Sequence, residues 1–300
     1  MVALFLLLAT CLLPANGALA QQPSDPALAA KIESLFHASI SADDDTPQLD
    51  EAKRIYSDRG LPTIAEVGDL PSYEFVVLLA SKELPLAFRT RISSQIEAAA
   101  ARHELPADAA IFYAARLRLE KLQAAAKSQP PSNPALRDEI AQMYKLDQAV
   151  RQRQGFDPMK MEQADRAHAA PLQAMLEKYG VPTYSMVGPD AAGEFVVMIQ
   201  HQPARFRAEV LPKLKANVEA GQADPESYAL VYDRSLRDAG KPQFYGEQLE
   251  CNSGEKMHEA PIDDAAHVNQ RRAELGLIRV ELYAQIAAEM MPQFCSQPQR

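Results

Sequence analysis

The segment GLPTIAEVGDLPSYEFVV, residues 60–77, recurs as GVPTYSMVGPDAAGEFVV at residues 180–197. Nine of the eighteen positions are identical at a constant offset of 120, without a gap. Self-similarity of this kind indicates an internal repeat, in which both copies share one fold. Because the copies differ in their polar residues, the first copy shows which residues the fold itself requires.

The repeat extends on both sides of this segment. Pro26-Ala27-Leu28 matches Pro134-Ala135-Leu136, and Phe88-Arg89 matches Phe206-Arg207. The upstream match has an offset of 108, so we expect about twelve additional residues (120 − 108) in the second copy, in a loop near 155–161. Each copy therefore covers roughly a hundred residues, the size of a small domain or of half a larger one.

This organisation predicts three parts. Residues 1–20 are expected to be a signal peptide, residues 21–130 a degenerate helical repeat, and residues 133–300 a second repeat that carries the function. The proline-rich stretch Ser128–Pro134 lies between the copies and is typical of a linker. The tail, residues 241–300, has no counterpart in the first copy.

The composition is that of an ordinary globular protein, with 47% hydrophobic and 24% charged residues. A net charge of −9 argues against nucleic acid or an anionic membrane as the main partner, because both require a basic face. We therefore expect a small ligand or another protein as the partner.

The chain begins with an apolar stretch that ends in Ala18-Leu19-Ala20. Small residues in this arrangement after a short apolar run are typical of a cleaved signal peptide, although this one has no Lys or Arg before the run. No later segment is long and apolar enough for a transmembrane helix. We expect a periplasmic or secreted protein that begins at Gln21 and has no integral membrane segment in the mature chain.

Two cysteines, Cys251 and Cys295, remain after removal of the signal peptide. In an oxidising compartment they are expected to form a disulfide, which would stabilise the fold by ~4 kcal/mol in the chain-entropy account. The alternative is two separate buried thiols.

Most of the mature chain has apolar residues at the three- and four-residue spacing of helices. In the first copy, helices are expected at 25–38, 46–58, 71–81, 85–103 and 106–126. In the second copy, they are expected at 134–153, 160–179, 190–201, 204–219 and 225–239.

The tail has a different pattern. Residues 244–249 and 256–259 flank the turn Asn252–Glu255 and predict a short hairpin. Helix is expected to resume near Asp264, with a break at Gly276. The predicted fold is mainly all-α, a tandem helical pseudo-repeat with one small β-hairpin in the C-terminal tail.

The second copy carries polar residues on three helices where the first copy has mostly small or apolar ones. These residues are Asp147, Gln148, Arg151, Gln200, His201, Asp233 and Arg234. Their counterparts in the first copy are, in the same order, Ser39, Ile40, Asp43, Ala80, Ser81, Ala114 and Ala115. A lone histidine at a helix end or an Asp–Arg pair can be purely structural. The presence of additional polar residues on three separate helices favours a common site.

A loop follows the third of these helices. The stretch Lys241–Gln248 places aromatic, amide and ammonium groups in a rigid segment with Pro and Gly, which fits a binding loop. Its candidate ligand-binding residues are Lys241, Gln243, Tyr245 and Gln248. A turn that leads into a strand fits the same stretch equally well.

A metal site is not expected. Four residues farther along the tail could be read as a ligand cluster, but their spacing matches no strong metal-binding pattern. They are His258, Asp263, Asp264 and His267. We expect no metal and no cofactor.

Residues 135–285 resemble a bacterial family that is catalogued only as a domain of unknown function. The resemblance follows the blocks Met143…Asp147-Gln148…Arg151, Tyr179–Pro182, Val187-Gly188, Gln200-His201, Asp233-Arg234, Gly240–Gln248, Pro261–Asp264, Arg271-Arg272 and Leu275–Leu277. Val181 stands where the family often has Trp, and Glu247 where it often has Thr. The resemblance implies a mostly helical domain, found in exported and other bacterial proteins, and it implies no particular activity, substrate or cofactor.

Three functions fit these residues. The first is a binding domain whose polar, partly cationic cleft uses Arg151, Arg234 and Lys241 to hold a small anionic or peptide-like ligand. The second is a hydrolase-like enzyme in which Asp233 orients His201 as general base. Against it, the sequence contains no nucleophile-elbow serine motif. The third is a structural or protein-interaction domain.

Overall fold

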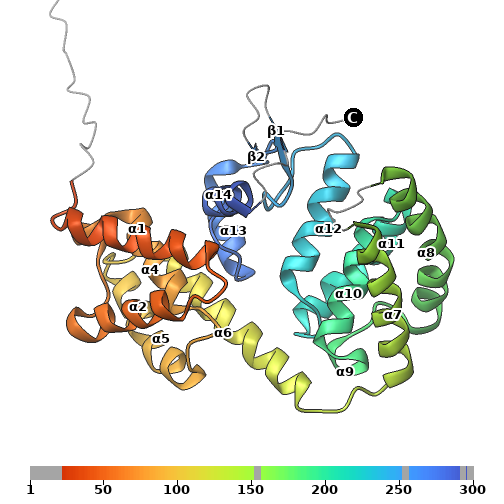
Figure 1. Ribbon diagram of the computed structural model, residues 1–300, viewed down its shortest axis with the longest axis horizontal. Coiled ribbons are helices and arrows are strands. Elements are labelled where there is room, and N and C mark those ends of the chain that lie inside the picture. The colour runs from red at the N-terminus through yellow and green to blue at the C-terminus, as the bar shows by residue number, and fades with distance from the viewer. Residues whose placement is uncertain (1–21, 152–156, 252–256, 291–294, 296–300) are drawn as a thin grey trace, which may run out of the picture.

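The computed structural model describes residues 22–151, 157–251, 257–290 and 295. Within these ranges the chain forms fourteen α-helices and one two-stranded antiparallel sheet, which confirms the predicted mainly all-α fold. Figure 1 shows two helical units, with the long helix α6 running from one to the other and the tail between them. The expected signal peptide and the hairpin turn at 252–255 lie outside the described residues.

The first unit contains α1 (Pro26–Ser41), α2 (Thr46–Arg59), α3 (Ile64–Val67), α4 (Asp69–Leu79), α5 (Leu86–Ala101) and α6 (Ala107–Lys127). The second unit contains α7 (Pro134–Arg151), α8 (Pro158–Tyr179), α9 (Tyr184–Val187), α10 (Pro189–Gln200), α11 (Ala204–Glu219) and α12 (Pro225–Asp238). The tail contains β1 (Leu249–Cys251), β2 (Met257–Glu259), the 3₁₀ helix η1 (Ala265–His267), α13 (Val268–Glu274) and α14 (Val280–Met290).

The two units pack their helices in the same pairwise order. Helix α1 lies on α4 as α7 lies on α10, and α5 lies on α6 as α11 lies on α12. The repeated segment also encodes two short helices that the sequence did not predict, α3 and α9. Each is preceded by a capping threonine, Thr63 or Thr183, whose hydroxyl accepts a hydrogen bond from a backbone N–H in the first turn.

The additional residues of the second copy lengthen a helix. Helix α8 has 22 residues, whereas its counterpart α2 has 14. It begins at Pro158 because the Asp157 side chain accepts hydrogen bonds from the N–H groups of Met159 and Lys160. The expected loop near 155–161 is therefore helical from Pro158 onward.

Each unit has its own hydrophobic core, and the helices of the tail pack into the first. The second core uses buried residues between Leu136 and Val231, whereas the first core includes Ala273 and Leu282 of the tail. Arg279 fastens this contact: its guanidinium donates to both carboxylate oxygens of Asp108, at 2.6 and 2.8 Å. The helical tail therefore completes the unit that is farther from it in the sequence.

The sheet pairs Leu249 with Glu259 and Cys251 with Met257. A disulfide joins Cys251 to Cys295, as predicted, with 5.4 Å between the two Cα atoms. None of the helices in the described ranges is long and apolar enough to cross a membrane.

Candidate functional site

The polar residues of α7 form a network around Asp147. Its carboxylate is only 1% exposed. Arg151 donates to both Asp147 oxygens at 2.9 Å, and the Gln148 amide donates to Oδ2 at 2.9 Å. Arg151 also pairs with Asp165 of α8. A buried carboxylate is costly unless such donors surround it, so this arrangement is more than a surface salt bridge.

His201 ends α10 close to this network. Burial, together with the charges of Arg151 and Arg234, lowers the pKa of His201 to about 4. The Asp147 charge acts in the opposite direction. The imidazole is therefore neutral at pH 7, and no described residue forms a hydrogen bond with its ring.

Three buried polar atoms nearby also find no hydrogen-bond partner among the described residues. They are Nδ1 of His168, Oε1 of Gln202 and Nε of Arg207. Nδ1 of His168 lies 3.7 Å from Oδ1 of Asp147, and the Gln202 amide donates to the backbone oxygen of Asp165 at 3.1 Å. We call the group Asp147, Arg151, Asp165, His168 and His201 the His201 corner.

Comparison with the first copy distinguishes the polar residues that the shared fold requires from those that only the second copy has. Arg207 pairs with Asp238, and its counterpart Arg89 pairs in the same way with Glu120. This pair is present in both units, so the shared fold accounts for it. The His201 corner has no such counterpart, because Ser39 and Ser81 stand at two of its positions.

Arg234 of α12 lies at the edge of the corner. Its side chain is exposed, and no described residue forms a hydrogen bond or ion pair with it. Its positive charge lowers the pKa of both His201 and Arg207, so it is close to them. Within the described ranges it is a cation without a partner, beside a neutral imidazole.

Asp233, its neighbour in sequence, has a different environment. It is 0% exposed and accepts hydrogen bonds from the backbone N–H groups of Phe244, Tyr245 and Glu247, at 2.7 to 3.0 Å. Burial raises the pKa of Asp233, and these backbone donors act against that rise. In the described part of the chain, no hydrogen bond or ion pair joins Asp233 to His201.

The remaining predicted residues belong mainly to the loop that Asp233 holds. Gln243 is fully buried, and its side-chain amide donates hydrogen bonds to the backbone oxygens of Gln248 and Ala260. Its amide oxygen accepts a hydrogen bond from the backbone N–H of Gln248. The ring of Tyr245 packs edge-on against Tyr232 and Phe244. Lys241 is exposed. The structure thus brings Asp147, Gln148, Arg151, His201 and Arg234 together, with Gln200 immediately before His201 in the chain, and places Asp233, Gln243, Tyr245 and Gln248 in a second group.

Comparison with known proteins identifies one family. A family of unknown function (DUF6624) matches residues 134–291, from the first residue of α7 to the residue after α14. The match covers more than half of the chain. The chain belongs to this family. No curated protein and no solved structure matches it.

The family segment, residues 134–291, contains the whole His201 corner and none of the first unit. It includes two corner residues that the sequence analysis missed, Asp165 and His168. Asp165 lies among the first eight residues of α8 (22 − 14), the part with no counterpart in α2. The extra length of the second copy was the available signal, because an insertion beside candidate residues can extend their site.

Proposed function

We propose that the family segment binds a small anionic ligand at the His201 corner. Arg234 carries this proposal, since it is an exposed guanidinium with no partner in the described structure and lies close to a half-buried, neutral His201. A guanidinium binds carboxylate or phosphate through two parallel hydrogen bonds. The neutral imidazole can donate one more hydrogen bond to the same anion.

Arg151 has a supporting role in this proposal. Its guanidinium is already engaged by Asp147 and Asp165, so it is less available to a ligand than that of Arg234. The network instead fixes the end of α7 beside His201. A ligand that contacts His201 and Arg234 would bridge α10 and α12, which pack against each other.

The geometry favours binding over hydrolysis. A histidine with a pKa of about 4 is a weak general base at neutral pH. Asp233, the residue expected to orient it, uses its oxygens for the backbone of the 244–247 loop. The enzyme hypothesis therefore gains no support from the positions of these two residues.

An NMR titration of the His201 ring tests the proposal. With inorganic phosphate or succinate as the probe, the pKa of His201 should rise from about 4 towards its ordinary value of 6.5, because a bound anion stabilises the imidazolium. Arg234→Ala should abolish the response to the anion. Arg166→Ala, which removes an exposed arginine paired with Glu162 on α8, should leave the response unchanged.

Two results would reject this function. One is a His201 pKa that neither anion changes. The other is an undiminished response in Arg234→Ala, which would show that the anion binds elsewhere.

We also propose that the protein is exported to the periplasm or secreted. The apolar run that ends in Ala18-Leu19-Ala20 supports export. The Cys251–Cys295 disulfide supports it independently, because disulfides persist mainly in oxidising compartments.

A further inference from the structure

The first unit contains a cavity at the position that corresponds to the His201 corner. It has a volume of about 340 Å³ and lies among α1, α4 and α6 and the tail segments that cover them. Ser39 and Ser81, the counterparts of Asp147 and His201, both line it. Small residues in the first copy thus leave space where the second copy has large polar side chains.

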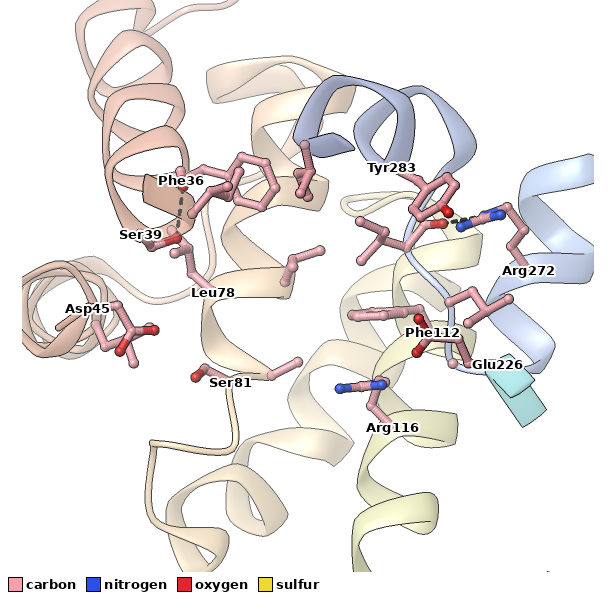
Figure 2. A pocket seen from close by; sticks show the side chains of 18 residues that line it. Phe36, Ser39, Asp45, Leu78, Ser81, Phe112, Arg116, Glu226, Arg272 and Tyr283 are labelled. Carbon is pink, nitrogen blue, oxygen red and sulfur yellow. Dashed lines mark hydrogen bonds between the residues drawn. The ribbon is translucent and has the colours of Figure 1, made fainter. Parts of the chain in front are cut away.

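The walls of this cavity are mainly apolar. Phe36, Leu78 and Phe112 come from the first unit, and Leu277 and Ile278 come from the tail. Figure 2 shows Phe36, Leu78 and Phe112 around the central space, with Ser81 at its lower side. Such a surface suits an apolar side chain of a ligand rather than a fully polar molecule.

Two charged side chains of opposite sign also line the cavity. Arg116 comes from α6 and Glu226 from the first turn of α12. Neither has an ion-pair or hydrogen-bond partner among the described residues, and they do not form an ion pair with each other. Glu226 keeps an exposed surface, but partial desolvation and the Asp224 charge raise the pKa of its carboxyl. The Arg116 charge lowers that pKa, so the two groups lie close enough to interact.

The other charged groups at the cavity are less suited to a ligand. Arg272 is 1% exposed and donates to Glu247 and to the backbone oxygens of Tyr245 and Ile278. Figure 2 places Asp45 on the opposite side of the cavity from Glu226. Arg116 and Glu226 are therefore the cation and anion available together.

We propose that this cavity binds a free α-amino acid with an apolar side chain. Arg116 would hold the carboxylate, Glu226 would hold the ammonium group, and the apolar walls would enclose the side chain. The volume is near the lower end of ligand pockets, about 300–1,000 Å³, which favours a single amino acid over a longer peptide. This site is separate from the His201 corner and assigns a function to the place where the first unit, the tail and the start of α12 meet.

Calorimetric titration of the full chain with four probes tests each contact. L-Phenylalanine carries both charged groups, 2-phenylethylamine lacks the carboxylate, and 3-phenylpropionate lacks the ammonium group. The wild-type protein should bind L-phenylalanine at least about tenfold more tightly than either analogue, since each charged hydrogen bond contributes to that degree. L-Leucine should bind as well, because it keeps both charges.

Two variants should respond selectively. Arg116→Gln should lower the affinity for L-phenylalanine about tenfold or more and leave the affinity for 2-phenylethylamine unchanged. Glu226→Gln should lower the affinity for L-phenylalanine to a similar degree and leave the affinity for 3-phenylpropionate unchanged. Glutamine keeps the Arg116 stem as far as Cδ, so the packing of α6 is retained. Lys121→Gln, at an exposed position of α6, is the control and should change nothing.

Three outcomes would overturn the assignment. The first is no heat of binding for L-phenylalanine or L-leucine. The second is 3-phenylpropionate binding as tightly as L-phenylalanine, which would identify an apolar anion as the ligand. The third is an equal loss of affinity for all probes in Arg116→Gln and Glu226→Gln, while both variants keep wild-type unfolding midpoints. In that case neither residue would contact a specific group of the ligand.

Discussion

Replacing Asp233 by alanine would remove the acceptor that holds the loop 244–247 against α12. The backbone N–H groups of Phe244, Tyr245 and Glu247 donate to this carboxylate. The site is fully buried, so water cannot readily replace the lost oxygens. We expect a loss of about 3–6 kcal/mol in the free energy of unfolding, at about 1–2 kcal/mol for each of the three unsatisfied donors.

The neighbouring variant Arg234→Ala provides the comparison. Arg234 is exposed and has no partner in the described structure, so its removal should change stability by less than about 0.5 kcal/mol. The double variant should lose the sum of the two effects, because the side chains do not contact each other. Urea unfolding followed by circular dichroism measures all four proteins.

The opposite pattern would refute this reasoning. If Asp233 and Arg234 formed an ion pair, each single variant would be destabilised and the double variant would recover much of the loss. An Asp233→Ala loss below about 1 kcal/mol would also contradict the reasoning, because it would mean that the loop does not depend on the carboxylate.

Three further predictions concern the tail, a buried carboxyl and the N-terminus. Gly276→Ala should destabilise the protein by about 2 kcal/mol in thermal unfolding, because Gly276 has φ +72° and an added Cβ would lie 3.2 Å from the Arg116 backbone nitrogen. Gly193→Ala on α10, where a Cβ has no neighbour within 4 Å, should not destabilise it. Burial raises the pKa of Glu74 to about 7, so the folded state binds its proton more tightly than the unfolded state between pH 4.5 and 7. The free energy of unfolding should therefore fall by about 3 kcal/mol as the pH rises through this window. Glu74→Gln should remove this fall. Urea unfolding that shows the same dependence of stability on pH in the variant would contradict the prediction. N-terminal sequencing of the exported protein should return Gln21, and a sequence that begins at Met1 would contradict the signal-peptide prediction.

The helices and the repeat could be predicted because their signals are local. Apolar spacing and capping residues identify a helix within one segment, and a constant offset identifies two copies of a fold. Thr63 and Thr183 show the limit of this approach, since the same segment also encodes two four-residue helices that are too short for periodicity to reveal.

The grouping of candidate residues could be predicted only in part. His201 and Asp147 were expected on separate helices, and their shared corner depends on the packing of α7 against α10. Asp233 and Arg234 are adjacent in sequence, but successive helical residues point about 100° apart. One is therefore buried under a loop of the tail while the other is exposed. The tail's position is set by long-range contacts, which one sequence does not reveal.

The docking of Arg279 on Asp108 has a consequence for the order in which the protein folds. These residues are 171 positions apart, and Arg279 also pairs with Asp69, 210 positions away. A ribosome releases the first unit early, yet that unit lacks Ala273 and Leu282 of its core until the last part of the chain emerges. The second unit needs no such delay, because among the described residues its buried core members all lie between Leu136 and Val231. The half that is synthesised second should therefore be the half that folds first, and the N-terminal unit should be the last to become resistant to proteases.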